Sequence, residues 1–338
     1  MFTAIRNYVG DVWGAWNDFW FSPANPATLS AIRVLTGAML FYTHLVWSFD
    51  LQGFFGRDGW LPLSFMDTVE QYQNGGPDGF ARWNWSYFDI NMPPAVLWVV
   101  HIAALVVFFF LMIGFFSRTM SVLAYVAAVS YANRVTPGAY FGLDKINCLL
   151  AMYLIIGPCG ARYSIDRIWR LRRGGPKEVP PSISANLAIR LIQIHMCIIY
   201  LFSGLGKLQG ESWWNGEAVW FSSANLEYQF LIDMTWLANH PWLVAVLTHA
   251  TVYWELSYSA LVWPRLTRPW VLLMAVLVHG GICVAYGMPT FGLVMLIGNL
   301  AFVSPETVRR LLDPAAGRVA NLLGGSGAGR GRAAAAAA

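Results

Sequence analysis

Residues 94–114 read PAVLWVVHIAALVVFFFLMIG, a run that contains no Asp, Glu, Lys or Arg. About 20 such residues are enough for a helix to cross the hydrocarbon core of a bilayer. Seven further apolar runs are long enough to span, or nearly so: 28–47, 119–134, 141–158, 186–207, 242–263, 270–286 and 289–303. The sequence therefore predicts an all-α fold, a polytopic membrane helical bundle of about eight transmembrane helices. Because the last two runs are short, a re-entrant pair over 270–303 remains an alternative to two full spans.

The composition supports a membrane protein and excludes several other classes. Of the 338 residues, 57% are hydrophobic and only 12% are charged, which is about half the charge of a soluble domain. The net charge of +4 comes from arginines in short loops, so it predicts no nucleic-acid partner. The four cysteines form no CxxC pair and no metal-ligand spacing with histidines, so no metal is expected. Membrane lipid is the partner that the composition does predict.

The charges of the loops orient the predicted bundle. Basic residues concentrate in 161–185, and the positive-inside rule places that loop in the cytoplasm. Further arginines fall on the same side: Arg118, Arg265, Arg268, Arg309 and Arg310. The two long segments on the other side, 48–93 and 208–241, are acidic and rich in aromatic residues. Only an even number of spans, with both termini cytoplasmic, satisfies all of these loops, and eight fits.

The same patterns divide the chain into three regions. Residues 1–24 place apolar side chains at steps of three and four, which is typical of an amphipathic helix lying in the membrane interface. Residues 25–305 hold all the predicted spans. Residues 306–338 turn to Gly, Ala and Arg after Pro314, so this cytoplasmic tail is expected to be low-complexity and disordered.

The run 186–207 carries the most informative polar stripe, at steps of three, four or seven. Its members are Arg190, Gln193, Tyr200, Ser203 and Lys207. Lys207 lies near the outer end of the run, where its side chain could snorkel to the lipid headgroups. Alternatively, it faces a cavity under the two outer loops, where burial would favour the neutral amine and make it a base.

A carboxylate also falls inside an apolar run. Glu255 lies deep in the run 242–263, where a charged group needs a partner. Arg33 and Arg190, both toward the inner half of the bundle, are the expected partners. A structural ion pair is favoured over a catalytic role for this carboxylate.

Three histidines fall at mid-depth or in the outer half of the predicted spans: His44, His249 and His279. A single histidine in a membrane helix most often makes an interhelical hydrogen bond. His249, about two turns below the outer face, is expected within reach of Lys207. His279 lies two or three turns deeper than Lys207, so no direct contact between those two is expected.

Several short sequence motifs are distributed along the chain. They are NPATLSAIR from Asn25 to Arg33, YSID from Tyr163 to Asp166, YLFSGLGKL from Tyr200 with Trp213-Trp214 after it, His249 with Glu255, and His279 with FGLVML from Phe291. In this order and spacing they resemble the HTTM family, bacterial relatives of the membrane part of vitamin K-dependent gamma-glutamyl carboxylase. The resemblance extends over about residues 25–305, and the lysine segment is its most specific part.

This resemblance implies a chemistry for Lys207. In the carboxylase, a lysine at the matching position deprotonates a reduced naphthoquinone, and the strong base that follows oxygen addition abstracts a glutamyl γ-proton before CO2 attacks. That lysine acts on the lumenal side, equivalent to the outer face to which charge assigns Lys207. Two features depart from the family pattern. The carboxylase has an Asn-His pair near the start of its fourth span, which is either absent here or replaced by Asp144. Its lumenal peptide-binding domain has no counterpart within these 338 residues.

Two hypotheses follow from the residues and the resemblance together. The leading one is a multi-pass protein of the bacterial plasma membrane, a quinone-dependent carboxylase- or oxygenase-like enzyme acting at the outer face. Its catalytic residues would be Lys207, His249 and Asp144. A reduced naphthoquinone would contact His44, Tyr200 and His279. The runner-up is a non-catalytic membrane factor for export, maturation or immunity of a secreted peptide, and a transporter ranks last because no internal repeat is found.

Overall fold

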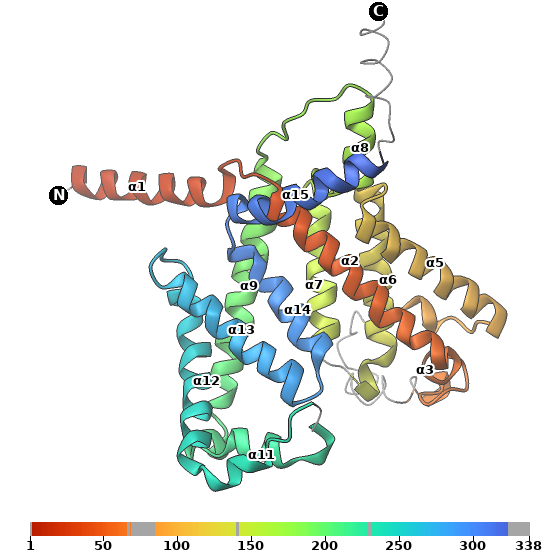
Figure 1. Ribbon diagram of the computed structural model, residues 1–338, viewed down its shortest axis with the longest axis vertical. Helices are drawn as coiled ribbons and strands as arrows, with labels where there is room; N and C mark the ends of the chain where they lie inside the picture. Colours follow the sequence, from red (N-terminus) through yellow and green to blue (C-terminus); the bar gives the residue numbers. More distant parts are fainter. Residues whose placement is uncertain (1, 66–67, 69–84, 140–141, 229–230, 324–338) are drawn as a thin grey trace, which may run out of the picture.

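The computed structural model describes residues 2–65, 68, 85–139, 142–228 and 231–323 of the chain (Figure 1). These residues form helices and short 3-10 turns, and among them only an isolated bridge between Ala24 and Ser182 has β geometry. The all-α prediction is therefore confirmed.

Each of the eight predicted apolar runs forms one α-helix. These helices are α2 (Ala27–Trp47), α5 (Pro94–Ile113), α6 (Ser117–Ala139), α7 (Gly142–Ile156), α9 (Ile183–Lys207), α12 (Pro241–Leu261), α13 (Arg268–Ala285) and α14 (Pro289–Asn299). Shorter or peripheral helices are α1 (Phe2–Phe21), α3 (Leu51–Phe55), α8 (Ile165–Arg172), α10 (Glu211–Trp214), α11 (Ala218–Ala224) and α15 (Pro305–Leu323). The 3-10 turns are η1 (Ser48–Asp50), η3 (Tyr87–Asp89), η4 (Leu226–Tyr228), η5 (Thr235–Asn239) and η6 (Leu300–Phe302).

Four helices in the described part of the chain are long and apolar enough to cross a membrane. They are the continuous segment Ala27–Phe55, α5, α9 and α13. A fifth would be added if Pro289–Phe302 and Pro305–Arg318, bent by 116°, form one broken span. Helix α14 alone has 11 residues and is about 16 Å long, which is shorter than the hydrocarbon core.

The helices pack mainly as neighbours in sequence, with α2 against α5, α6 against α7, α9 against α12 and α13 against α14. Figure 1 shows α7, α9 and α14 in the middle of the bundle. Glycines allow the closest approaches, because a Cβ on Gly37 would lie 2.6 Å from the Met112 Cα. A Cβ on Gly292 would lie 2.5 Å from the His279 carbonyl oxygen, so α13 and α14 are in backbone contact there.

A buried arginine holds one end of this bundle together. Arg33 of α2 is fully buried and donates to the carbonyls of Leu111 (2.7 Å), Met112 (3.1 Å) and Cys159 (3.2 Å), and also to that of Tyr163. The last carbonyls of a helix have no partner within it, and a cation at a helix C-terminus is favourable. Arg33 therefore caps α5 and the turn after α7 at the same time.

Asp166 completes this junction from the next helix. The carboxylate accepts from the backbone N–H of Phe116 (2.8 Å) and from both the N–H and the hydroxyl of Ser117 (2.7 Å each). It thereby satisfies N–H groups at the start of α6, as a capping side chain does. The segment from Tyr163 to Asp166 is thus a structural link between α2, α5, α6 and α8.

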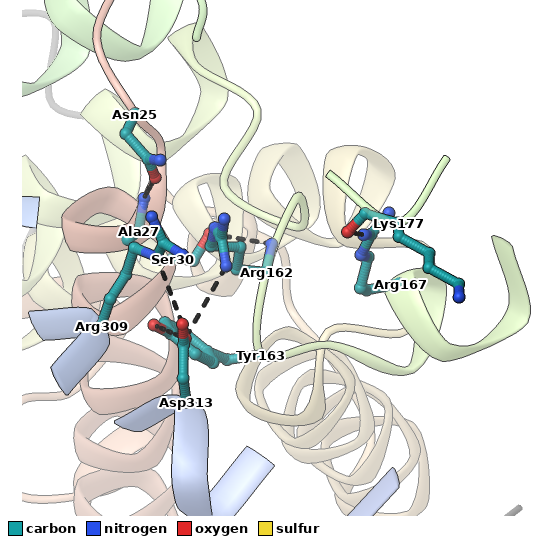
Figure 2. Close-up of polar contacts among 9 residues, drawn as sticks. All are labelled: Asn25, Ala27, Ser30, Arg162, Tyr163, Arg167, Lys177, Arg309 and Asp313. Carbon is teal, nitrogen blue, oxygen red and sulfur yellow. Dashed lines mark hydrogen bonds and ion pairs between the residues drawn. The ribbon is translucent and has the colours of Figure 1, made fainter. Parts of the chain in front are cut away.

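Helix α15 occupies a segment that was expected to be disordered, and this is a correction to the sequence analysis. Its Asp313 accepts a hydrogen bond from the Tyr163 hydroxyl (2.8 Å) and forms ion pairs with Arg309 (3.2 Å) and Arg162 (3.7 Å) (Figure 2). Val308 is buried against α2. The cause is local: residues 305–313 are amphipathic with charged partners on the bundle, whereas the Gly- and Ala-rich composition begins only after them.

Helix α1 lies across the same end of the bundle as α8 and α15 (Figure 1). An exposed apolar stripe runs along it: Ile5, Tyr8, Val12 and Trp16. Its C-terminal carbonyls accept from α9, since Asn186 Nδ2 lies 2.8 Å from the Phe19 oxygen and Arg190 Nε lies 3.2 Å from it. The amphipathic helix is as predicted, and its position in a membrane interface stays a prediction.

Candidate functional site

Lys207, the residue on which the sequence argument depends, forms a buried ion pair. Its Nζ lies 2.6 Å from Glu255 Oε2 and 2.7 Å from Ser203 Oγ. The two charged side chains are 19% and 10% exposed. The Nζ also lies 5.1 Å from the ring centroid of Trp213, a cation–π distance. Two acceptors among the described residues leave one N–H of the ammonium for a further partner.

This amine turns back along α9 rather than extending past the end of the helix. Side chains of an α-helix lean toward its N-terminus, so Lys207 reaches back over the turn that holds Ser203. Helix α12 is close enough to meet it because Gly204 faces that helix, and a Cβ there would lie 3.0 Å from the Leu256 side chain. The spacing of Ser203, Gly204 and Lys207 therefore builds the contact with Glu255.

The expected partners of Glu255 were wrong. Arg33 is taken up by four backbone carbonyls, as described above. Arg190 donates to the end of α1 and to Gln193 Oε1 (3.1 Å), and its guanidinium lies 4.2 Å from the Phe19 ring centroid. The position of Lys207 along its run places the Cα near the end of the helix, away from Glu255. It does not show that Nζ turns back toward that carboxylate, so the two arginines were taken as the partners.

A hydrogen-bond chain lies deeper in the same group of helices. The Tyr200 hydroxyl is 2.7 Å from His279 Nε2 and accepts from Asn299 Nδ2 at 2.9 Å. Asn299 Oδ1 in turn accepts from the Tyr258 hydroxyl at 2.7 Å. All four residues are buried. The sequence singled out Tyr200 and His279 separately, and the structure joins them directly.

The ring of Trp254 connects this chain to the ion pair. Its centroid lies 4.9 Å from that of Tyr200 and 6.1 Å from that of His279, and it precedes Glu255 on α12. The ion pair and the chain therefore form one polar region, lined by aromatic rings, among α9, α12, α13 and α14.

His249 sits at the edge of this region. Its Nε2 lies 3.2 Å from the Trp214 carbonyl oxygen, and its ring stacks on Tyr253 with a centroid distance of 6.4 Å. Within the Trp213-Trp214 pair, the Trp213 ring contacts Lys207 and the Trp214 backbone carbonyl contacts His249. A direct role of His249 beside Lys207 stays a prediction.

His44 belongs to a different cluster. It packs against Tyr131 and Phe108 at centroid distances of 4.5 and 4.4 Å, and its Nδ1 lies 2.7 Å from the Leu40 carbonyl oxygen. Tyr131 is also 2.6 Å from His101 Nδ1, whose Nε2 is 2.8 Å from Ser48 Oγ. The sequence analysis missed His101, although it lies in the most apolar run, where any polar residue is a signal.

Asp144 and the cavity expected beside Lys207 are the remaining parts of the predicted site. Asp144 lies in the first turn of α7, and its role stays a prediction. A cavity of about 680 Å³ lies between the segment from Gln52 to Trp60 and the start of α5 up to Leu97. That volume is in the range of small-molecule sites, but the predicted site residues do not line it. In the described ranges, no group of three or more His, Cys, Asp or Glu residues could hold a metal ion.

A comparison with protein families identifies the family of this chain. A family model described as the HTTM domain matches residues 63–306, which is more than half of the chain. No curated protein and no solved structure matches the chain.

Proposed function

This chain belongs to the HTTM family, and from that premise we propose that it is a quinone-dependent membrane enzyme of carboxylase or oxygenase type. The observation that carries the proposal is the inward-turned Lys207 amine, held by Ser203 and Glu255 beside aromatic rings. Lys207 would be the base, and a polypeptide or small molecule would be the acceptor.

The proposal includes a topology. In it the apolar helices cross the plasma membrane of a bacterial cell with both termini in the cytoplasm, and α13 with the short α14 forms either two spans or a re-entrant pair. Support comes from Figure 1, in which α1, α8 and α15 lie at one end of the bundle. The arginine-rich segment 161–185 lies at that end, while α9 runs away from it and ends at Lys207. The ion pair would then open to the outer face, where a secreted substrate is available.

The residues around Lys207 fit a reduced naphthoquinone. A flat apolar ring system needs aromatic or aliphatic walls and a few polar contacts at its oxygens. Trp213, Trp254 and Tyr200 supply the rings. His279 supplies a buried Nδ1 that has no hydrogen-bond partner in the described part of the chain. Bound there, such a quinol would supply the reactive oxygen chemistry of the family.

Glu255 gives Lys207 a way to act as a base. In the ion pair the amine is protonated and has no lone pair to offer. Moving the shared proton from Nζ to Glu255 Oε2 leaves a neutral amine and a neutral acid, which avoids holding two buried charges. The amine can then accept a proton from a ligand hydroxyl. Glu255 thus stores one proton while Lys207 takes another.

A second candidate is a non-catalytic membrane factor for export, maturation or immunity of a secreted peptide. One observation favours it. The Lys207 ammonium is already neutralised by Glu255 at 2.6 Å. In this second candidate the sole role of the pair is to fix α9 against α12. In that case neither residue contacts a ligand, and only the charges matter.

The test is a titration of purified protein with a reduced naphthoquinone, followed by tryptophan fluorescence and by oxygen consumption. The enzyme proposal predicts saturable binding and turnover by the wild type. It predicts loss of turnover in both Lys207→Ala and Lys207→Arg, because arginine keeps the charge but does not give up its proton.

The matched control is Lys177→Ala, which removes an exposed lysine at the opposite end of the bundle. Its turnover should equal that of the wild type. Normal turnover in Lys207→Arg would contradict the base and favour the structural pair. No binding by folded wild-type protein would sink the quinone proposal and leave the membrane factor.

A further inference from the structure

The hydrogen-bond chain that ends at His279 has a fixed direction. Tyr258 donates to Asn299 Oδ1 at 2.7 Å. The Asn299 amide nitrogen is 2.9 Å from the Met295 carbonyl oxygen, which can only accept. Reversing the amide would set two oxygens against each other, so Nδ2 must face Met295 and, at 2.9 Å, the Tyr200 hydroxyl.

This direction determines where the proton of His279 lies. The Tyr200 oxygen accepts from Asn299, and His279 Nε2, 2.7 Å away, is the acceptor available to the Tyr200 hydrogen among the described residues. The arrangement that leaves this buried hydroxyl hydrogen paired therefore points it to Nε2. Nε2 is then an acceptor, and in a neutral imidazole the hydrogen must be on Nδ1. A protonated imidazole would also carry a hydrogen on Nδ1. Either way, Nδ1 is a donor.

That donor has no acceptor among the described residues. His279 is 4% exposed, and its Nδ1 is a buried atom without a hydrogen-bond partner. Leaving such a group unpaired costs about 1–3 kcal/mol, so an unpaired donor in a native site needs a reason. The surrounding rings are those of Trp254 and Phe291, both at centroid distances of 6.1 Å. An acceptor carried on an apolar body fits these surroundings.

We infer that Tyr258, Asn299 and Tyr200 hold His279 in its Nδ1–H form so that this N–H donates to the oxygen of a ring-borne carbonyl or hydroxyl in the ligand. The three other residues are positioning residues, and His279 is the group that contacts the ligand. Naming a quinol as that ligand rests on the proposed function, whereas the tautomer does not. A hydrogen on Nδ1 also prevents that nitrogen from ligating a metal.

The tautomer is measured by ¹⁵N NMR of protein labelled at its six histidines, reconstituted in lipid. The His279 signals, assigned by their loss in His279→Gln, should show a protonated Nδ1 and an unprotonated Nε2. Tyr200→Phe removes the donor to Nε2, and the hydrogen should then move toward Nε2. A protonated Nε2 with a bare Nδ1 in the wild type would overturn the inference.

The matched control is Tyr153→Phe. Tyr153 also meets a histidine, since its hydroxyl is 2.8 Å from His195 Nδ1 on another pair of helix faces. This variant should move only the His195 signals. A shift of the His279 signals in this control would mean that the change spreads through the fold, and it would contradict a local relay.

The ligand contact is tested by adding a reduced naphthoquinone to the same samples. The His279 Nδ1 signal should shift, and His279→Gln should bind the quinol roughly tenfold more weakly, as loss of one hydrogen bond predicts. His279→Asn places an amide N–H near the former Nδ1 and should bind within about threefold of the wild type. Methylnaphthalene, which has no oxygen, should bind all three proteins alike.

The two proposals fail in different ways. If the quinol quenches tryptophan fluorescence with saturation but leaves the His279 Nδ1 signal unmoved, this inference is wrong and the proposed function survives. If the quinol does not bind to folded wild-type protein, both the contact and the quinone function are wrong, whatever the tautomer.

Discussion

Two cations at opposite ends of the bundle, the buried Arg33 and the half-buried Lys207, have opposite surroundings. Arg33 is met by four neutral backbone carbonyls, two in the last turn of α5 and two in the segment between α7 and α8. Lys207 is met by one carboxylate and one hydroxyl, and one N–H remains. Carbonyls cannot take up a proton, whereas a carboxylate can. The first arrangement fixes a charge, and the second allows a proton to move.

The acceptors around each of these cations distinguish a structural role from a candidate chemical role. Arg190 and Arg268 follow the Arg33 pattern, since each donates to carbonyls at a helix end. Arginine suits that task because it stays charged and offers several donors in a fixed fork. Among the buried or half-buried cations described here, only Lys207 is a residue that can shed its proton in a folded protein.

The largest effect is expected from Arg33→Met. Four carbonyls would lose their donor in a buried site, which we expect to cost at least about 3 kcal/mol and to abolish folded protein. Fluorescence-detected size exclusion in detergent measures this loss. The control is Arg118→Met, an exposed arginine at the same end, which should accumulate normally. Normal accumulation of Arg33→Met would contradict its structural role.

The next effect tests whether Lys207 and Glu255 depend on each other. Removing one partner of a buried pair costs about 3–5 kcal/mol, while removing both costs much less. Lys207→Met and Glu255→Leu should each lower the thermal unfolding midpoint, and the double variant should recover most of the loss. Additive losses would show that the pair does not exist in solution.

A smaller effect is expected from Gly204→Ala. The new methyl would meet Leu256 at about 3.0 Å, so α12 must move by a few tenths of an ångström, at about 1 kcal/mol. Quinol turnover should fall because Nζ and the carboxylate separate. Gly206→Ala is the control, since a Cβ there meets nothing within 4 Å. Equal turnover in both variants would contradict the close approach of α9 and α12.

The smallest effect concerns pH at the end of the bundle that holds α15. Burial and the hydrogen bond to Asp313 raise the pKa of Tyr163 above its ordinary value of 10.0. A raised pKa means that this contribution to α15 docking is complete below pH 10.0 and is lost as pH rises through the folded-state pKa. Hydrogen exchange of α15 should speed up above pH 10.0 in the wild type. Tyr163→Phe should lose this pH dependence, and an unchanged dependence would assign it to another group.

Hydropathy predicted the positions of all eight apolar helices, because apolar length is a property of the local sequence. The run 94–114 became α5 (Pro94–Ile113) almost residue for residue. The run 119–134 underestimated α6 (Ser117–Ala139), since a helix continues past its apolar part. Helix α15 was missed because its stability comes from the contacts that its residues Asp313 and Val308 make with the bundle. Composition does not show such tertiary contacts.

The candidate site was predicted less completely, and the reason is geometric. Periodicity gives the face of a helix but not which neighbour that face meets. Tyr200 and His279 were both named, yet their contact depends on the rotation of α9 against α13. Lys207 and Glu255 were judged by the depth of their backbones, and a lysine side chain that leans back one turn changes that depth. His101 and its partner Tyr131 were missed for the same lack of interhelical information.

The most direct test of the account asks whether Lys207 acts through its proton or through its charge. Lys207→Cys can be alkylated with bromoethylamine, which restores a primary amine, or with bromoethyl-trimethylammonium, which restores only a fixed positive charge. The wild type, treated in parallel, controls for the four native cysteines. The account predicts that naphthoquinol turnover returns with the amine and not with the quaternary ammonium. Equal recovery with both reagents would contradict it and would make Lys207 a structural cation like Arg33.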